Sequence, residues 1–156
     1  MNRIAQLDSQ TTIGPAKALF DGVQGKLGVV PNLIRVLGNA PAALKGYLNF
    51  SAALADGSFS PKVREQIALA VAETNQCAYC LSAHTFIAGK LGLTQQDLAE
   101  ARQANAADPR TDAILKLARS IVVQRGELGA TGLEHARNAG LTDGEIIETV
   151  AHVALN

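Results

Sequence analysis

The stretch SPKVREQIALAVAETNQCAYCLSAH, residues 60–84, contains one expected helix and the beginning of the next. Ser60 followed by Pro61 is the usual order of an N-cap and a first helical residue, so a helix is expected from there to about Thr74. Helix signals of this kind recur along the chain, whereas alternating β-branched stretches are absent and aromatic residues make up only 4% of it. The sequence therefore predicts an all-α fold.

Other helix boundaries follow from capping signals. Gly92 and Gly140 each come just after a periodic segment, where a helix end favours a left-handed residue. Capping-box patterns mark three helix starts, at Thr94 to Asp97, Thr131 to Glu134 and Thr142 to Glu145. We expect about eight helices in a single domain of residues 1–156, with helical segments near 15–25, 31–38, 41–56, 60–75, 78–91, 95–105, 111–126, 132–139 and 143–155.

A weak internal repeat underlies this order. Leu93-Thr94 and Leu141-Thr142 lie 48 positions apart, and each pair follows a glycine and precedes a short acidic helix. The same offset aligns Leu69 with Leu117. Two copies of a three-helix unit, packed about a pseudo-twofold axis, would explain the pattern, and chance agreement in a chain rich in Ala and Leu is the alternative.

Composition and charge restrict the class of protein. The chain has 156 residues, of which 47% are hydrophobic, as expected of one globular domain. Lys plus Arg equals Asp plus Glu at 14 each, so nothing indicates a nucleic-acid surface. The longest aliphatic run, Ile67 to Ala72, is too short to cross a bilayer, and the first residues lack the apolar segment of a signal peptide. We therefore expect a cytoplasmic protein.

The two cysteines of the chain point to chemistry or to metal binding. Cys77, Cys80 and His84 have the spacing i, i+3, i+7, which places them on one face of a helix. A helix start and a nearby histidine both favour the thiolate, which is the reactive form of cysteine. Glu65 shares a face with apolar residues of the preceding helix and so borders the core. We prefer it as the acid–base partner to Glu73, which lies near the helix end where a carboxylate is readily solvated.

Two other interpretations stay open at this point. The four residues Glu65, Cys77, Cys80 and His84 would also make a four-ligand zinc set, with His135 and His152 as further possible ligands, although no second cysteine pair exists. Alternatively both cysteines are simply buried. His152, on the apolar last segment, is expected to be a core or interface histidine with a satisfied partner.

The spaced set of Glu65, Cys77-Ala-Tyr-Cys80 and His84 resembles the alkyl hydroperoxidase D family, within the carboxymuconolactone decarboxylase-like superfamily. The resemblance extends to both flanks. VVPNLIRVLGNAPAALKGYLNFSAAL, residues 29–54, is similar to the amino-terminal helices of the peroxidase-related branch, and ETVAHVALN, residues 148–156, looks like the helix near the end of such chains.

This resemblance implies an all-helical protein that assembles as a homotrimer or homohexamer and reduces organic hydroperoxides without metal or haem. It implies that Cys80 is oxidised to a sulfenic acid and that Cys77 transfers a proton and then closes a redox disulfide. Glu65 and His84 would form the relay that activates the thiols. The implied reductant is a dithiol, such as the lipoyl group of a carrier protein.

Two features remain to be placed. Tyr79 stands between the cysteines where some members of the family have histidine, and we expect it and Leu69 to line the substrate pocket. The decarboxylase branch of the superfamily typically lacks the cysteine pair, yet a related fold does not fix function. A lactone-decarboxylase activity in which the cysteines are incidental is therefore the alternative enzyme.

Overall fold

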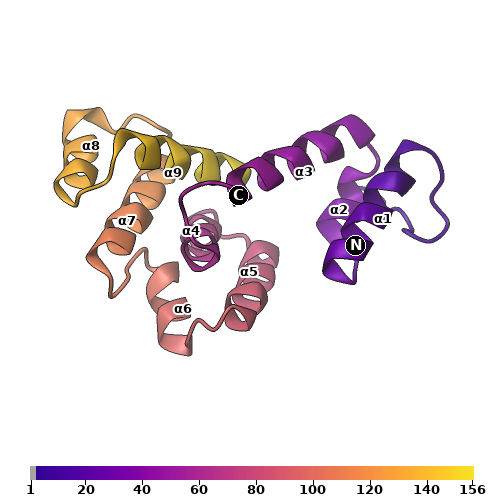
Figure 1. Cartoon of the computed structure of the whole chain (residues 1–156), viewed down its shortest axis with the longest axis horizontal. Helices are drawn as coiled ribbons and strands as arrows, with labels where there is room; N and C mark the ends of the chain where they lie inside the picture. Colours follow the sequence, from indigo (N-terminus) through magenta and orange to yellow (C-terminus); the bar gives the residue numbers. More distant parts are fainter. Residues whose placement is uncertain (1–2) are drawn as a thin grey trace. The chain divides into compact units, whose positions relative to one another are not determined.

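The computed structural model describes residues 3–156, and helices are the only regular structure in that range (Figure 1). Met1 and Asn2, which belong to the expected domain and amino-terminal segment, lie outside the described residues. The all-α fold is confirmed, and each expected segment overlaps one observed helix. The nine helices are α1 (Pro15–Leu27), α2 (Asn32–Leu37), α3 (Pro41–Ala55), α4 (Pro61–Thr74), α5 (Ala78–Lys90), α6 (Gln95–Arg102), α7 (Pro109–Val123), α8 (Gly129–Asn138) and α9 (Asp143–Leu155).

The chain divides into two compact units, Met1–Ala53 and Leu54–Asn156. Unit 1 contains α1, α2 and most of α3, and its core forms around the fully buried side chains of Phe20 and Leu44. Unit 2 contains α4 to α9 with a separate and larger core. A single domain spanning the whole chain therefore stays a prediction.

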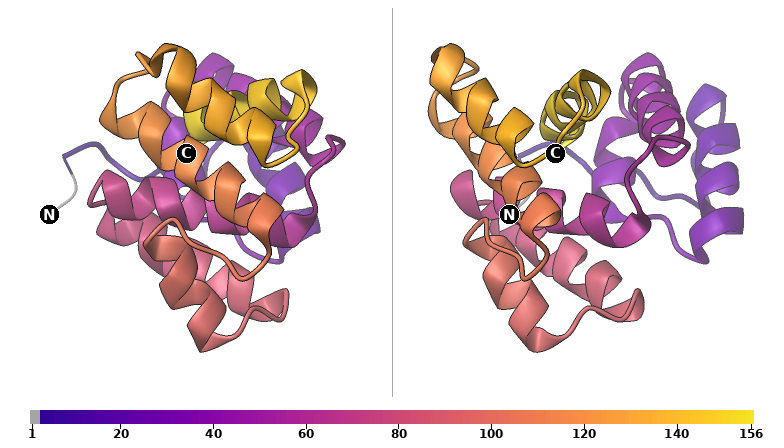
Figure 2. Two further views of the ribbon diagram at one scale, coloured as in Figure 1. Left: turned by 90° about the vertical axis from the view of Figure 1, so that its left-hand side faces the viewer. Right: turned by 60° about the vertical axis from the view of Figure 1, so that its left-hand side comes forward.

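Helix α4 is the centre of unit 2. Its residues Ile67 to Ala72 are all buried, and α5, α6, α7 and α9 pack against it. Figures 1 and 2 show α5 and α6 (pink) on one side of α4 and α7 to α9 (orange and yellow) on the other. The aliphatic run Ile67 to Ala72 therefore fills the middle of the core of unit 2. None of the helices in residues 3–156 has the length and apolar character needed to span a bilayer.

Helices α4 to α6 and α7 to α9 follow the same plan, in agreement with the internal repeat. Ser60 and Asp108, 48 positions apart, cap α4 and α7, and each side chain accepts the backbone N–H three residues further on. A proline then opens each helix. Thr94 and Thr142, with the same offset, form complete capping boxes at the starts of α6 and α9, as predicted.

The two copies also tie their helices together in the same way. Lys62 Nζ donates to Gly92 O at 3.4 Å, and Arg110 Nη1 donates to Gly140 O at 2.7 Å. Both glycines have the predicted left-handed backbone, with φ of 82° and 84°. A basic side chain from the first helix of each copy thereby binds the carbonyl just before the third helix.

The capping box expected at Thr131 to Glu134 is wrong. Helix α8 begins at Gly129, and its N-cap residue Leu128 makes no side-chain capping bond. The chain reverses directly after α7, where Gly126 N–H binds Ile121 O at 2.9 Å, and this tight reversal starts the next helix early. Thr131 consequently lies inside the first turn of α8.

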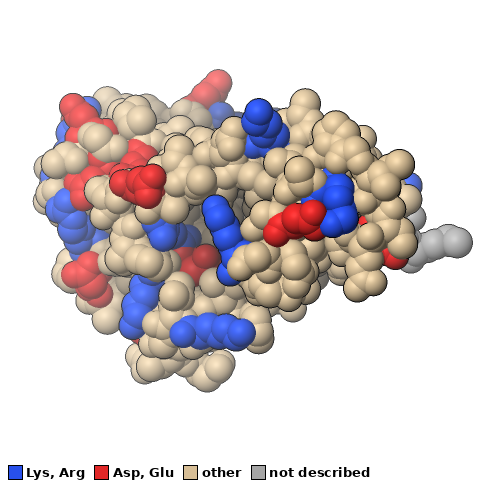
Figure 3. Space-filling model, turned by 45° about the vertical axis from the view of Figure 1, so that its right-hand side comes forward, with Lys and Arg blue, Asp and Glu red and all other residues tan. Residues whose placement is uncertain are grey.

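The surface carries charges of both signs. Figure 3 shows Lys and Arg side chains interspersed with Asp and Glu on the face drawn, with uncharged surface between them. This distribution agrees with the balanced composition.

Candidate active site

The end of α4 positions the first cysteine. Gln76 has a left-handed backbone (φ 54°) and its N–H binds Glu73 O, while the N–H of Cys77 reaches back to Ala72 O at 2.9 Å. These two bonds form a Schellman motif, which ends a helix and redirects the chain. Cys77 is therefore attached through its backbone to α4, the central helix of unit 2.

Cys77 is also the N-cap residue of α5. Its Sγ accepts the N–H of Cys80 at 3.2 Å. The two cysteines are joined as a disulfide, with their Cα atoms 5.3 Å apart, and both are partly exposed. A helix N-terminus offers unpaired N–H groups to an anion, so the same position stabilises a thiolate when the pair is reduced.

Glu65 and His84 meet between α4 and α5. Glu65 Oε2 lies 2.8 Å from His84 Nδ1, and the two side chains are only 18% and 24% exposed. A carboxylate can only accept a hydrogen bond, so Nδ1 carries the proton and neutral imidazole keeps its free lone pair on Nε2. His84 lies four residues after Cys80 on the same helix, which makes them neighbours on one face. The arrangement supplies a base beside a thiol.

The other glutamate of α4 has a different role. Glu73 Oε2 pairs with Arg102 Nε at 2.6 Å, in a bridge to the end of α6 whose side chains are 41% and 47% exposed. Such an exposed pair links two helix ends and leaves the carboxylate in water. The geometry thus agrees with the preference for Glu65.

The two expected pocket residues lie in different environments. Tyr79 is 46% exposed on the first turn of α5, between the cysteines. Leu69 has no exposed surface and packs within the core of unit 2. Other helices pack against α4 on several sides, and they bury the face that carries Leu69. Its assignment to an open substrate pocket is therefore corrected to a packing role.

The possible zinc ligands are not gathered around one point. No group of three or more His, Cys, Asp or Glu side chains within residues 3–156 has a geometry that can hold a metal ion. His135 is exposed on α8. His152 is 3% exposed, as expected for a core histidine. Its Nε2 lies 3.8 Å from the Glu148 carboxylate, within ion-pair distance, but makes no hydrogen bond. Burial, only partly opposed by the Glu148 charge, lowers the pKa of His152.

A positioning residue that the sequence did not reveal is Glu148 on α9. Its carboxylate accepts the N–H and hydroxyl of Ser58, at 3.0 and 2.6 Å, and the N–H of Phe59 at 3.1 Å. Burial raises the pKa of Glu148, but the hydrogen bonds from Ser58 and Phe59 outweigh this effect, so the pKa is lowered overall. A Cβ at Gly57 would lie 2.3 Å from Glu148 Oε1, so a larger residue there would displace the carboxylate from its hydrogen bonds. This contact fixes the loop that leads into α4, and the glycine was its only sequence signal.

Comparison with known proteins places these features in context. The family model described as the carboxymuconolactone decarboxylase family matches residues 41–122, a range that includes all four candidate residues. No curated protein matches the chain.

Solved structures share the fold. One is described as an alkylhydroperoxidase AhpD core, an uncharacterized peroxidase-related protein from Ralstonia eutropha JMP134, with 26% identity, a TM-score of 0.82, and coverage of 98% of this chain and 83% of that chain. An uncharacterized peroxidase-related protein from Silicibacter sp. TM1040 has 24% identity and a TM-score of 0.80, covering 99% and 86%. The debrominase Bmp8 has 18% identity and a TM-score of 0.80, covering 99% and 84%. The last two similarities concern the fold alone.

Proposed function

We propose that this member of the carboxymuconolactone decarboxylase family reduces organic hydroperoxides with a Cys77–Cys80 dithiol. Its similarity to an AhpD-like, peroxidase-related protein supports this activity. The observation that carries the proposal is the hydrogen bond between Glu65 and His84, one turn beyond Cys80. Packing alone does not require a carboxylate–imidazole pair beside two cysteines at a helix start.

In the first step the Cys80 thiolate attacks the O–O bond of the hydroperoxide. His84 accepts the thiol proton at Nε2, since its Nδ1–H is held by Glu65. A bond forms between sulfur and the terminal oxygen while the O–O bond breaks. The alkoxide takes up a proton and leaves as an alcohol, so the sulfur has lost two electrons and is a sulfenic acid.

In the second step the Cys77 thiol attacks the sulfenic acid, an S–S bond forms, and water leaves. A dithiol then restores the pair through a mixed disulfide and is itself oxidised to a disulfide. The net reaction converts one hydroperoxide and one dithiol into an alcohol, water and a disulfide. The choice of Cys80 as the attacking sulfur follows from the resemblance, since the N–H that Cys77 Sγ accepts favours a thiolate at that position too.

The substrate and partners follow from the same family and from the surface of α5. Tyr79, Phe86 and Ile87 are 46%, 64% and 42% exposed on the helix that carries the cysteines, which supports an organic hydroperoxide over hydrogen peroxide. The reductant is a dithiol such as a lipoylated carrier protein, and the protein acts as a homotrimer or homohexamer.

The test is the intact mass and free-thiol count of the reduced, folded protein before and after one equivalent of cumene hydroperoxide. We expect both thiols to disappear with the loss of two hydrogens, and dihydrolipoamide to restore them. Thiols that do not react with the peroxide, or zinc bound to the purified protein, would contradict the proposal. Turnover of a lactone acid that survives loss of both cysteines would support the decarboxylase alternative instead.

A further inference from the structure

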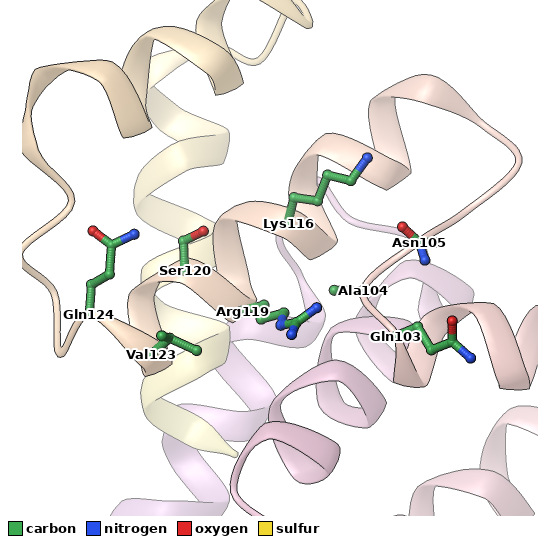
Figure 4. Close-up of a pocket in the computed structure, with 8 residues that line it drawn as sticks. All are labelled: Gln103, Ala104, Asn105, Lys116, Arg119, Ser120, Val123 and Gln124. Atoms are coloured by element: carbon green, nitrogen blue, oxygen red, sulfur yellow. The ribbon is translucent and has the colours of Figure 1, made fainter.

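A second polar site lies in unit 2, away from the residues assigned to the thiol chemistry. It is a surface pocket of about 330 Å³ between α7 and the segment that follows α6 (Figure 4). None of the residues that line it is acidic, although the whole chain has as many acidic residues (Asp and Glu) as basic ones (Lys and Arg). Its volume is at the lower end of the range of small-ligand sites.

Two cations define the charge of the pocket. Lys116 and Arg119 lie three residues apart on α7, so both project from one face of the helix. Figure 4 shows the Arg119 guanidinium directed from α7 toward the segment that carries Ala104. Lys116 Nζ donates to Asp112 Oδ2 at 2.6 Å, which leaves two of its three N–H groups for another acceptor.

Arg119 has no internal partner. Within residues 3–156 its side chain makes no hydrogen bond and no ion pair. Most other cations of unit 2 are engaged: Arg102 and Arg110 pair with carboxylates, for example, and Lys62 binds a backbone carbonyl. The planar fork of Arg119 therefore remains available to two oxygens of a ligand.

Neutral hydrogen-bonding groups complete the pocket. Gln103 and Asn105 lie on one side, and Ser120 and Gln124 lie along α7 on the other. Amide and hydroxyl groups donate to the remaining oxygens of an anion without adding charge. At the corresponding positions of the first copy of the repeat, α4 has only apolar residues, Ala68 for Lys116 and Val71 for Arg119, and both are buried. The polar face is thus a property of α7 alone.

From these observations we propose that the pocket binds a phosphate group, either as the free ion or as the monoester of a small metabolite. A guanidinium fork binds two oxygens of a phosphate, Lys116 adds a second positive charge to the lining, and the volume leaves room for a group of sugar size. The inference does not rest on the thiol chemistry, so either can fail while the other stands.

The experiment is a titration of the full chain with inorganic phosphate, and separately with ribose 5-phosphate, followed by backbone amide NMR shifts at constant ionic strength. We expect saturable shifts confined to the pocket, and binding at least about tenfold weaker in Arg119→Gln, because a charged hydrogen-bond donor is lost. Arg125→Gln is the matched control, since Arg125 is also exposed and unpaired near the end of α7 but does not line the pocket.

The outcomes separate the possibilities. Equal affinity for the two probes identifies a site for the free ion, and tighter binding of ribose 5-phosphate identifies a phosphorylated metabolite. Shifts that do not saturate, or that weaken equally in Arg119→Gln and Arg125→Gln, would show only nonspecific attraction of anions to surface charge and would overturn the proposal.

Discussion

Replacing Glu65 by glutamine tests the relay most directly. Glutamine keeps the size of the side chain but removes the charge that faces His84 Nδ1 at 2.8 Å. Because the two side chains are only 18% and 24% exposed, water screens this contact incompletely. A hydrogen bond to a charged group contributes about 1.5–3 kcal/mol, and each 1.36 kcal/mol is a factor of ten in rate. Thiol oxidation should therefore slow by about 10- to 150-fold.

The assay is the disappearance of free thiols in the reduced protein under excess cumene hydroperoxide, followed as a first-order decay. Glu73→Gln is the control, because Glu73 lies on the same helix and its exposed pair with Arg102 is worth little. We expect its rate to stay within about twofold of the unchanged protein. A wild-type rate in Glu65→Gln would refute the relay, and so would equal losses in both variants while the unfolding midpoint is unchanged.

Three further predictions concern the thiols and the stability of unit 2. Cys80→Ser should abolish the reaction with hydroperoxide, whereas Cys77→Ser should leave a sulfenic acid that dimedone traps and mass spectrometry detects; the opposite pattern would reverse the roles. Glu148→Gln should reduce the free energy of unfolding in urea by about 1.5–3 kcal/mol, because three hydrogen bonds to a partly buried carboxylate are weakened, and an unchanged midpoint would contradict this. Burial lowers the pKa of His152, so the unfolded chain binds the proton more readily; the stability that neutral His152 contributes is complete above about pH 6.5 and is lost as the pH falls below it. His152→Asn should flatten the dependence of the urea midpoint on pH between about 7 and 5, and an unchanged slope would exclude this residue.

The helical fold was predictable because its signals are local. Ser60, Thr94 and Thr142 each bond a backbone N–H three residues away, and such short-range bonds can be read from a few adjacent letters. Thr131 failed as a cap because the reversal after α7, a property of the preceding helix end, determines where α8 begins. The two compact units have no sequence signal either, since they depend on which cores form and no linker composition marks the boundary.

The candidate site was predictable where spacing along one helix determines proximity. Cys77, Cys80 and His84 share a face of α5. The apolar neighbours of Glu65 on α4 favour it over Glu73 as the acid–base partner. Contacts between distant segments were not predictable. The carboxylate of Glu148 binds a loop 90 residues earlier, and Arg119, which lines the proposed phosphate site, gives no signal in a chain with balanced charge.

The second copy of the repeat has neither a carboxylate nor an imidazole at the positions of Glu65 and His84. The residue that corresponds to Glu65 is Ala113, which is 2% exposed in the core, and the residue that corresponds to His84 is Gly132. This backbone position therefore packs well with a small apolar side chain and needs no charge. A largely buried carboxylate without a partner costs several kcal/mol, and the imidazole offsets this cost only when both residues are present. Because the same three-helix plan folds without either group, packing alone does not require the pair, and we expect its presence in the copy that also carries the cysteines to serve the proposed thiol chemistry.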